Sequence, residues 1–130
     1  MTDFAFRFDP RYRALLAVTG VRPDRAFVRV AGGELDARFG PWRVRTPVAN
    51  VTCTQVTGPY SPLKAIGTRL SVKDRGLTFG SNTERGLCIE FRTPVRGIEP
   101  TGRLRHPGLT VTVEDVDGLR DALRQNENVF

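Results

Sequence analysis

The stretch AFVRVAGGELDARFGPWRVR, residues 26–45, decides the fold because it places two turn signals between alternating segments. Gly32-Gly33 can form a two-residue hairpin loop, since glycine tolerates the positive φ that such loops need. Gly40-Pro41 can form a second tight turn, in which the proline supplies a fixed negative φ. The stretch therefore predicts a meander of three short antiparallel strands.

These two turns, taken alone, predict a register that separates apolar from charged side chains. Folding at the first loop places Val30 opposite Leu35, and folding at the second places Phe39 opposite Trp42. The predicted apolar face holds Val28, Val30, Leu35, Ala37, Phe39, Trp42 and Val44. The predicted polar face holds Arg29, Asp36, Arg38, Arg43 and Arg45, with Asp36 between Arg29 and Arg45. A slip of one residue would mix the two faces, so their separation supports the register.

The stretch HPGLTVTVEDVDGLRDALR, residues 106–124, changes its period partway through. Leu109, Val111 and Val113 alternate as in a strand, whereas Val116, Leu119 and Leu123 recur at helical spacing. Asp115 is a suitable N-cap for the helix. A helix of about ten residues is too short to stand alone, so its apolar stripe is expected to dock on the sheet.

The remaining segments complete a mainly β interpretation. Residues 51–56 (VTCTQV) and 86–91 (GLCIEF) read as strands, with Leu87, Ile89 and Phe91 inward and Cys53 buried. A third hairpin is expected between TRLSV and GLTF, with Val72 opposite Leu77 and Leu70 opposite Phe79. Residues 92–108 have the composition of a long loop. We predict one domain, with an N-terminal extension (1–25), barrel strands (26–113) and a terminal helix (115–124). Within the extension, FAFRF (4–8) can form a strand and RYRALLAV (11–18) a helical turn.

Length and composition bound the class of protein. The chain has 130 residues, 39% of them hydrophobic, which is typical of one globular domain. No stretch approaches the roughly 18 apolar residues of a membrane helix, and the N-terminus lacks a secretory signal. We therefore expect a cytoplasmic protein with reduced thiols at Cys53 and Cys88. One histidine and two separated cysteines predict no metal site.

The net charge of +6 is unevenly distributed. Residues 114–130 contain five acidic residues against two arginines, so the rest of the chain carries a net charge of +9. The candidate anion- or partner-binding residues are Arg38, Arg43, Arg45, Lys64 and Arg69. Arg38 and Arg43 are expected to face each other without an intervening acid, and such a pair is a natural place for a bound anion.

A second basic run contains Arg92, Arg96, Arg103, Arg105 and His106, and reads as an arm able to contact phosphates non-specifically. It lacks interleaved aromatic residues, so nucleic acid is not the expected partner. His106 has no nucleophile motif to accompany it, and a loop hydrogen bond is its expected role. Trp42 and Tyr60 are expected to be packing anchors. The sequence predicts no catalytic and no cofactor-binding residues.

The stretch GPYSPLKAIGTRLSVKDRGLTFGSNTERGLCIEFRTPV, followed by RHPGLTVTVEDVDGL, resembles a group of small actinobacterial proteins of unknown function. The strand-plus-helix ending resembles that of bacterial pleckstrin-homology-like domains. This resemblance implies an antiparallel barrel of about seven strands, closed by a C-terminal helix. Members of that fold often bind membrane lipids. Here the hairpin loop is short and Asp36 stands where a basic residue is expected, which disfavours a phosphoinositide site.

Two further interpretations stay open beside a binding module. The stretch LLAVTGVRPDRAFVRV, residues 15–30, is similar to the Leu-Leu-x-Thr-x-Gly stretch of split-barrel flavin or deazaflavin oxidoreductases. The basic surface also suits peripheral binding to anionic membranes. Our leading expectation is a non-enzymatic scaffold that meets a protein partner through its arginine-rich outer face or a strand edge, without a cofactor. It is expected to be a monomer or a homodimer.

Overall fold

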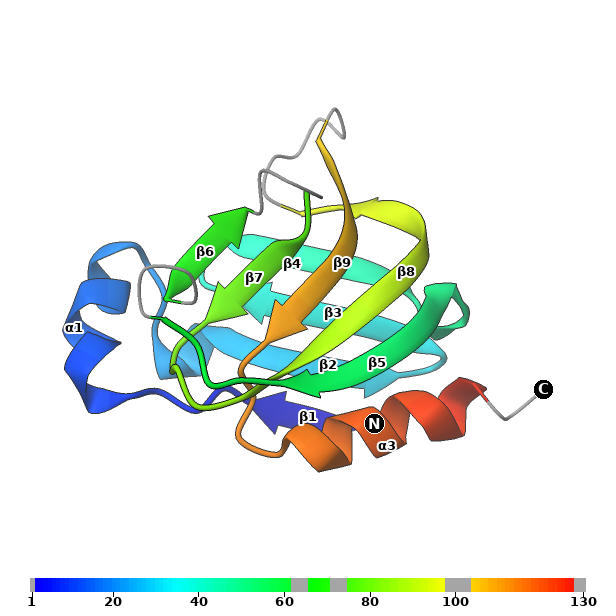
Figure 1. The fold of residues 1–130 in the computed structure, drawn as a ribbon, viewed down its shortest axis with the longest axis horizontal. Helices are drawn as coiled ribbons and strands as arrows, with labels where there is room; N and C mark the ends of the chain where they lie inside the picture. Colours follow the sequence, from blue (N-terminus) through cyan, green and yellow to red (C-terminus); the bar gives the residue numbers. More distant parts are fainter. Residues whose placement is uncertain (1, 62–65, 71–74, 98–103, 128–130) are drawn as a thin grey trace.

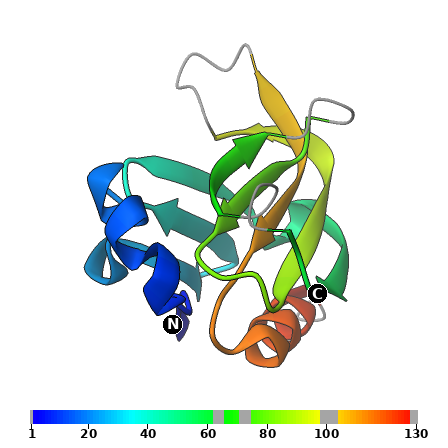
Figure 2. The same ribbon diagram turned by 60° about the vertical axis from the view of Figure 1, so that its left-hand side comes forward.

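The protein is described here by a computed structural model that covers residues 2–61, 66–70, 75–97 and 104–127. In these residues the chain is mainly β, with two sheets stacked face to face and a C-terminal helix (Figure 1). The first sheet has the strand order β1-β2-β3-β4, and the second has the order β5-β8-β9-β7-β6. The turned view separates the first sheet, with α1 at its end, from the second sheet, with α3 beneath (Figure 2).

The first sheet confirms the predicted meander and its register. Val30 lies opposite Leu35, and Phe39 lies opposite Trp42, as the two turns predict. Gly32 and Gly40 both adopt positive φ, at 58° and 61°. The predicted apolar face is buried except for Trp42, which is half-buried against the core. The strands are β1 (Thr2–Ala5), β2 (Ala26–Ala31), β3 (Glu34–Phe39) and β4 (Trp42–Pro47).

The N-terminal segment belongs to this sheet and to the core. Strand β1 pairs with β2, although we expected residues 1–25 to lie outside the barrel strands. Phe4 and Phe6 are buried, and Phe6 forms a bridge with Val113 near the C-terminal helix. The segment continues through helix α1 (Pro10–Val18) and a short 3-10 turn, η1 (Pro23–Arg25). Its alternating Phe4 and Phe6 are buried in the core, and this burial favours its addition to the sheet.

The second sheet corrects the expected all-antiparallel barrel of about seven strands. Among the described residues, the two sheets together hold nine strands, β7 and β9 run parallel, and no closed barrel forms. A 3-10 turn, η2 (Val48–Asn50), carries the chain from the first sheet to the second. The second-sheet strands are β5 (Val51–Thr57), β6 (Gly67–Leu70), β7 (Leu77–Gly80), β8 (Gly86–Arg96) and β9 (Arg105–Val111).

Three local predictions in this sheet were wrong. The third hairpin places Leu70 opposite Leu77, two residues from the expected register, because its connection is longer than four residues; Val72 lies outside the described residues. Residues 92–108 are not one long loop, since β8 continues to Arg96 and β9 begins at Arg105. Cys53 is exposed rather than buried, because a bulge between Val51 and Cys53 reverses the alternation.

The core joins the two sheets, and the C-terminal helix docks beneath them as predicted. Phe39 of β3 stacks on Phe79 of β7, with ring centroids 5.2 Å apart. Helix α3 (Val116–Glu127) contacts β5, β8 and η2. Its stripe of Val116, Leu119 and Leu123 is buried. Asp115 caps it, because its Oδ1 accepts a hydrogen bond from the backbone of Gly118 at 3.0 Å.

Candidate anion-binding groove

A groove of about 920 Å³ lies where the edge strand of the first sheet meets the bent end of the second. One wall is β4 with the turn before it, the floor includes η2, and the other wall is formed by β8 and the start of β9. None of the described lining residues is acidic. Five of them are arginines: Arg43, Arg45, Arg92, Arg96 and Arg105. Two basic segments separated by more than forty residues in the chain therefore share one surface.

Strand β8 reaches the groove because its pairing with β9 is interrupted. The register shifts between Glu90 and Val95, so that several residues of β8 bulge away from the ladder. Pro94 lies in this bulge and has no N–H to donate. Asn50 of η2 satisfies the neighbouring backbone instead: Thr93 donates its N–H to Asn50 Oδ1 at 2.8 Å, and Asn50 Nδ2 donates to the Thr93 carbonyl at 2.9 Å. This side chain joins the turn below the groove to its far wall.

The floor of the groove is closely packed. Asn50 Nδ2 also donates to Oγ1 of the buried Thr46, at 3.0 Å, which ties η2 to β4. Gly97 follows β8, and a Cβ there would lie 2.8 Å from Leu77 Cδ2 and 3.1 Å from Val44 Cγ2. The shorter contact would force Leu77 to shift and the longer one would crowd Val44, so glycine lets the end of β8 approach the core. The backbone segments that carry the groove arginines are therefore held in place by packing and hydrogen bonds within the protein.

The two arginines of β4 are paired with acids of β3. Arg43 forms two hydrogen bonds with Asp36, at 2.6 and 2.9 Å, and Arg45 pairs with Glu34 at 2.8 Å. Hydrogen bonding from Arg43 holds the pKa of Asp36 below its ordinary value, and the same bonds raise the pKa of Arg43. The predicted register around Asp36 is confirmed, but its ion pair runs diagonally to Arg43. Arg29 instead pairs with Asp3.

The facing wall carries charge of a different kind. Arg92 and Arg96 are exposed, and in the described part of the chain neither forms an ion pair. Arg96 lies directly opposite Arg105 in the β8–β9 ladder, and both side chains are exposed. Arg92 and Arg96 can therefore receive an anionic group without losing an ion pair to a described residue. This wall is therefore the better place for an anionic group.

The other predicted site residues lie elsewhere. Arg38 faces Arg43 as expected, but its Nε donates to the Gly40 carbonyl at 3.2 Å while Arg43 turns to Asp36. The two guanidinium groups therefore bind separate partners within the protein, and an anion site between them stays a prediction. Arg69 donates to the Ile66 carbonyl at 2.7 Å and does not line the groove. Lys64 and Arg103 lie outside the described residues.

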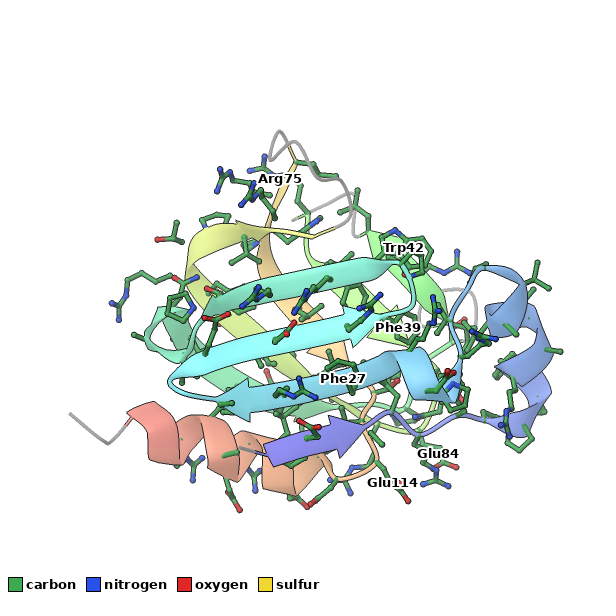
Figure 3. All side chains as sticks on the ribbon, turned by 180° about the vertical axis from the view of Figure 1, so that it is seen from behind. Phe27, Phe39, Trp42, Arg75, Glu84 and Glu114 are labelled. Carbon is green, nitrogen blue, oxygen red and sulfur yellow. The ribbon has the colours of Figure 1, made fainter. Side chains whose placement is uncertain are left out.

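Other residues singled out from the sequence have structural roles. His106 is fully buried in β9, where its Nδ1 donates to the carbonyl of Arg75 at 2.8 Å, so the expected hydrogen bond to a loop is present. Phe27 lies on the outer face of β2, and Arg29 stacks over its ring at 5.0 Å (Figure 3). Tyr60 is half-buried and its hydroxyl contacts that of Thr57. Asn50 was not predicted, because only the folded chain shows where its amide points.

The described residues hold no group of three or more histidine, cysteine or carboxylate side chains suited to a metal ion. None of the described groove-lining residues comes from residues 15–30, the stretch similar to flavin-binding split barrels, and Leu15 and Val18 of that stretch lie in α1. In the same described ranges, neither helix is long and apolar enough to cross a bilayer.

Comparison with known proteins identifies no relative. No protein-family model matches the chain, and no curated protein or solved structure matches it either. The function must therefore be argued from the chemistry of the groove.

Proposed function

We propose that this protein is a non-enzymatic binding module that holds an acidic segment of a protein partner in the arginine groove. The observation that carries the proposal is the convergence of Arg43 and Arg45 with Arg92, Arg96 and Arg105 around one hollow. Arginine donates hydrogen bonds to carboxylates in a planar, two-pronged geometry. It stays protonated at neutral pH, so these side chains are suited to binding anions and not to proton transfer.

The groove suits a protein segment better than a nucleic acid. Trp42 and three prolines, Pro41, Pro47 and Pro94, give it apolar surface beside the charges. Protein interfaces commonly combine arginine with an aromatic anchor in this way. Trp42 is the one aromatic side chain among the described lining residues, whereas single-stranded nucleic acids are usually held by several stacked aromatic residues.

A peptide alternating glutamate and valine tests the proposal. Its affinity, measured by fluorescence anisotropy at about 0.15 M salt, is expected to fall about tenfold in the double variant Arg92→Gln/Arg96→Gln. The control variant Arg13→Gln/Arg25→Gln removes the same charge from exposed arginines outside the groove and should keep most of the affinity. Equal losses of affinity in both variants would show that only net charge matters, and would refute the proposal that the groove is the binding site.

The same assay includes a single-stranded oligonucleotide of similar charge. Tighter binding of the oligonucleotide, lost in Arg92→Gln/Arg96→Gln, would reassign the groove to nucleic acid. The acidic peptide is expected to bind more tightly, because its flexible carboxylates can pair with arginines on both walls. Affinity should also decline with added salt, since the exposed charges are screened.

A second candidate function, binding to anionic membrane surfaces, is favoured by one separate observation. Leu15 and Val18 on α1 are 62% and 86% exposed, and the exposed Arg11 and Arg13 lie on the same helix. Apolar side chains flanked by arginines suit the interface of a bilayer. Sedimentation with phosphatidylserine vesicles would support this function if Leu15→Ser/Val18→Ser abolished it. Sedimentation that survives this double variant would remove α1 from consideration.

A relationship to pleckstrin-homology-like domains is the finer fold proposal. It is supported by the chain's ending, in which β9 leads into a helix packed beneath the strands. The parallel pair β7–β9 is foreign to an all-antiparallel barrel. We propose the relationship for an open form of the fold, in which β4 stays unpaired with the second sheet. An experimental structure in which the C-terminal helix did not pack on β5 and β8 would count against it.

A further inference from the structure

The outer edge of β4 presents its backbone to the groove. Val48 donates its N–H to the Gly33 carbonyl at 2.8 Å, which continues the β3–β4 register beyond both strands. In an antiparallel ladder, hydrogen-bonded pairs alternate with non-bonded pairs. Counting back from Val48, the residues that bond to β3 are Thr46, Val44 and Trp42. The N–H and C=O groups of Arg43 and Arg45 therefore point away from β3.

No described segment uses these backbone groups. Strand β4 pairs with β3 alone, and within the described ranges no turn or loop forms a backbone hydrogen bond with Arg43 or Arg45. Strand β8 lies close to β4 without pairing with it, just as helix α3 lies close to β5, an edge strand of the second sheet. An edge with unpaired backbone groups is a template for another strand unless it is blocked. Pro47, at the end of β4, blocks only its own position.

We infer that the acidic segment binds as an added antiparallel strand on β4, with a carboxylate at every second residue. This inference rests on the proposed function and specifies the shape of its ligand. Residues opposite Arg43 and Arg45 would form hydrogen-bonded pairs with them, so their own N–H groups would point at β4. Directly opposite residues share a face of the sheet, which brings their carboxylates beside the two guanidinium groups.

The two walls of the groove then have separate roles. Arg92 and Arg96 attract acidic groups whatever the conformation of the ligand, because their side chains are exposed and carry no ion pair within the described residues. The edge of β4 selects a ligand that is extended, since only an extended backbone can match its donors and acceptors. Asp36 and Glu34 of β3 pair with the guanidinium groups of Arg43 and Arg45 on the outer face of the sheet, so a ligand carboxylate would share these groups with the two acids.

Backbone methylation of the ligand tests this inference directly. In a peptide alternating glutamate and valine, N-methylation of the glutamates removes the N–H groups that would face β4. The same number of N-methyl groups on the valines removes N–H groups that would face away, so this peptide is the matched control. The glutamate-methylated peptide should bind about tenfold more weakly than its parent, and the valine-methylated peptide within about threefold of it.

A pair of protein variants tests the same edge from the other side. Arg45→Gln removes the charge and keeps the outward N–H, whereas Arg45→Pro removes both; proline is tolerated on an edge strand where the N–H faces outward. Thermal unfolding checks that both variants fold. Arg45→Pro is expected to bind the parent peptide about fivefold more weakly than Arg45→Gln.

The outcomes separate the inference from the proposed function. If the parent peptide does not bind at all, the proposed function fails, and the inference fails with it. If the parent binds but the two methylated peptides are equal, and Arg45→Pro matches Arg45→Gln, the groove binds acidic segments without strand addition. If the valine-methylated peptide is the weaker one, carboxylates do not lie opposite the arginines, and the inferred register is refuted.

Discussion

The two sheets differ in how far apart in the chain their paired strands lie. In the first sheet, β2, β3 and β4 pair in sequence order through two-residue turns. In the second sheet, β5 pairs with β8, and β7 pairs with β9 across the whole of β8. Turn chemistry decides a register when partners are neighbours, whereas distant partners depend on packing. The arginine groove lies between the two sheets and has one wall from each.

Truncation of the aromatic stack should have the largest effect, because it joins the two sheets. The ring of Phe39 contacts Phe79 at 5.2 Å and Phe6 at 5.0 Å between centroids, and all three are buried. Phe39→Ala and Phe79→Ala should each lower the free energy of unfolding by about 4 kcal/mol. Urea unfolding followed by the fluorescence of Trp42, the one tryptophan, measures this loss.

If the sheets fold as one unit, the two truncations will not be additive and circular dichroism will follow the same transition as Trp42. Two separate transitions would mean that the meander is stable without the second sheet, which the shared core contradicts.

A comparison of two glycines tests whether the meander depends on its turns alone or also on contacts with other segments. Gly32 and Gly40 both have positive φ, but a Cβ at Gly40 would lie 2.7 Å from the Gly20 carbonyl oxygen, whereas a Cβ at Gly32 meets nothing within 4 Å. Gly40→Ala should cost about 3 kcal/mol of stability, and Gly32→Ala about 1 kcal/mol. Equal losses in thermal unfolding would show that only the turn conformation matters, and that the contact with Gly20 does not.

Removal of the Asn50 amide tests the connection between the sheets. Asn50→Ala leaves the Thr93 backbone without its two partners and should lower stability by about 2 kcal/mol. Amide hydrogen exchange should show lost protection at Thr93, while the amide of Val44, which bonds within the first sheet, stays protected. Unchanged exchange at Thr93 would mean that Asn50 does not hold the bulge of β8.

Acid should weaken the first sheet by a small amount. The pKa of Asp36 lies below its ordinary 3.8, chiefly because Arg43 hydrogen-bonds to the carboxylate. The ion pair therefore contributes fully above pH 3.8 and is lost as the pH falls through the lower folded value. We expect a loss of about 1 kcal/mol in this range, and a flatter pH profile in Asp36→Asn. A steeper profile in the variant would contradict this assignment.

Removing the ion pair between Asp36 and Arg43 should also raise the affinity of the groove for the acidic peptide. In Asp36→Asn the guanidinium loses its charged partner and becomes available to a carboxylate on the ligand, so the acidic peptide should bind about threefold more tightly. The control is Asp3→Asn, which releases Arg29 two strands away and should leave the affinity unchanged.

The candidate site was predictable in its parts but not in its assembly. Alternation alone predicts that Arg43 and Arg45 share one surface of the meander. The sequence predicts a basic run that includes Arg92, Arg96 and Arg105, but Pro94 and the glycines around it predict a loop there instead of two strands. That the two sets meet depends on the bulge in β8 and on Asn50, and neither Pro94 in that bulge nor the sequence around Asn50 shows which segment it meets.

On its own, the sequence determined those elements whose structure depends on interactions between residues close together in the chain. The turns at Gly32-Gly33 and Gly40-Pro41 specify the meander, and the change of period after Val113 specifies the terminal helix, because φ preferences and side-chain alternation act over a few residues. The tertiary structure alone decided the parallel pairing of β7 with β9 and the groove. Their energy comes from burying surfaces contributed by distant segments, which no local pattern records.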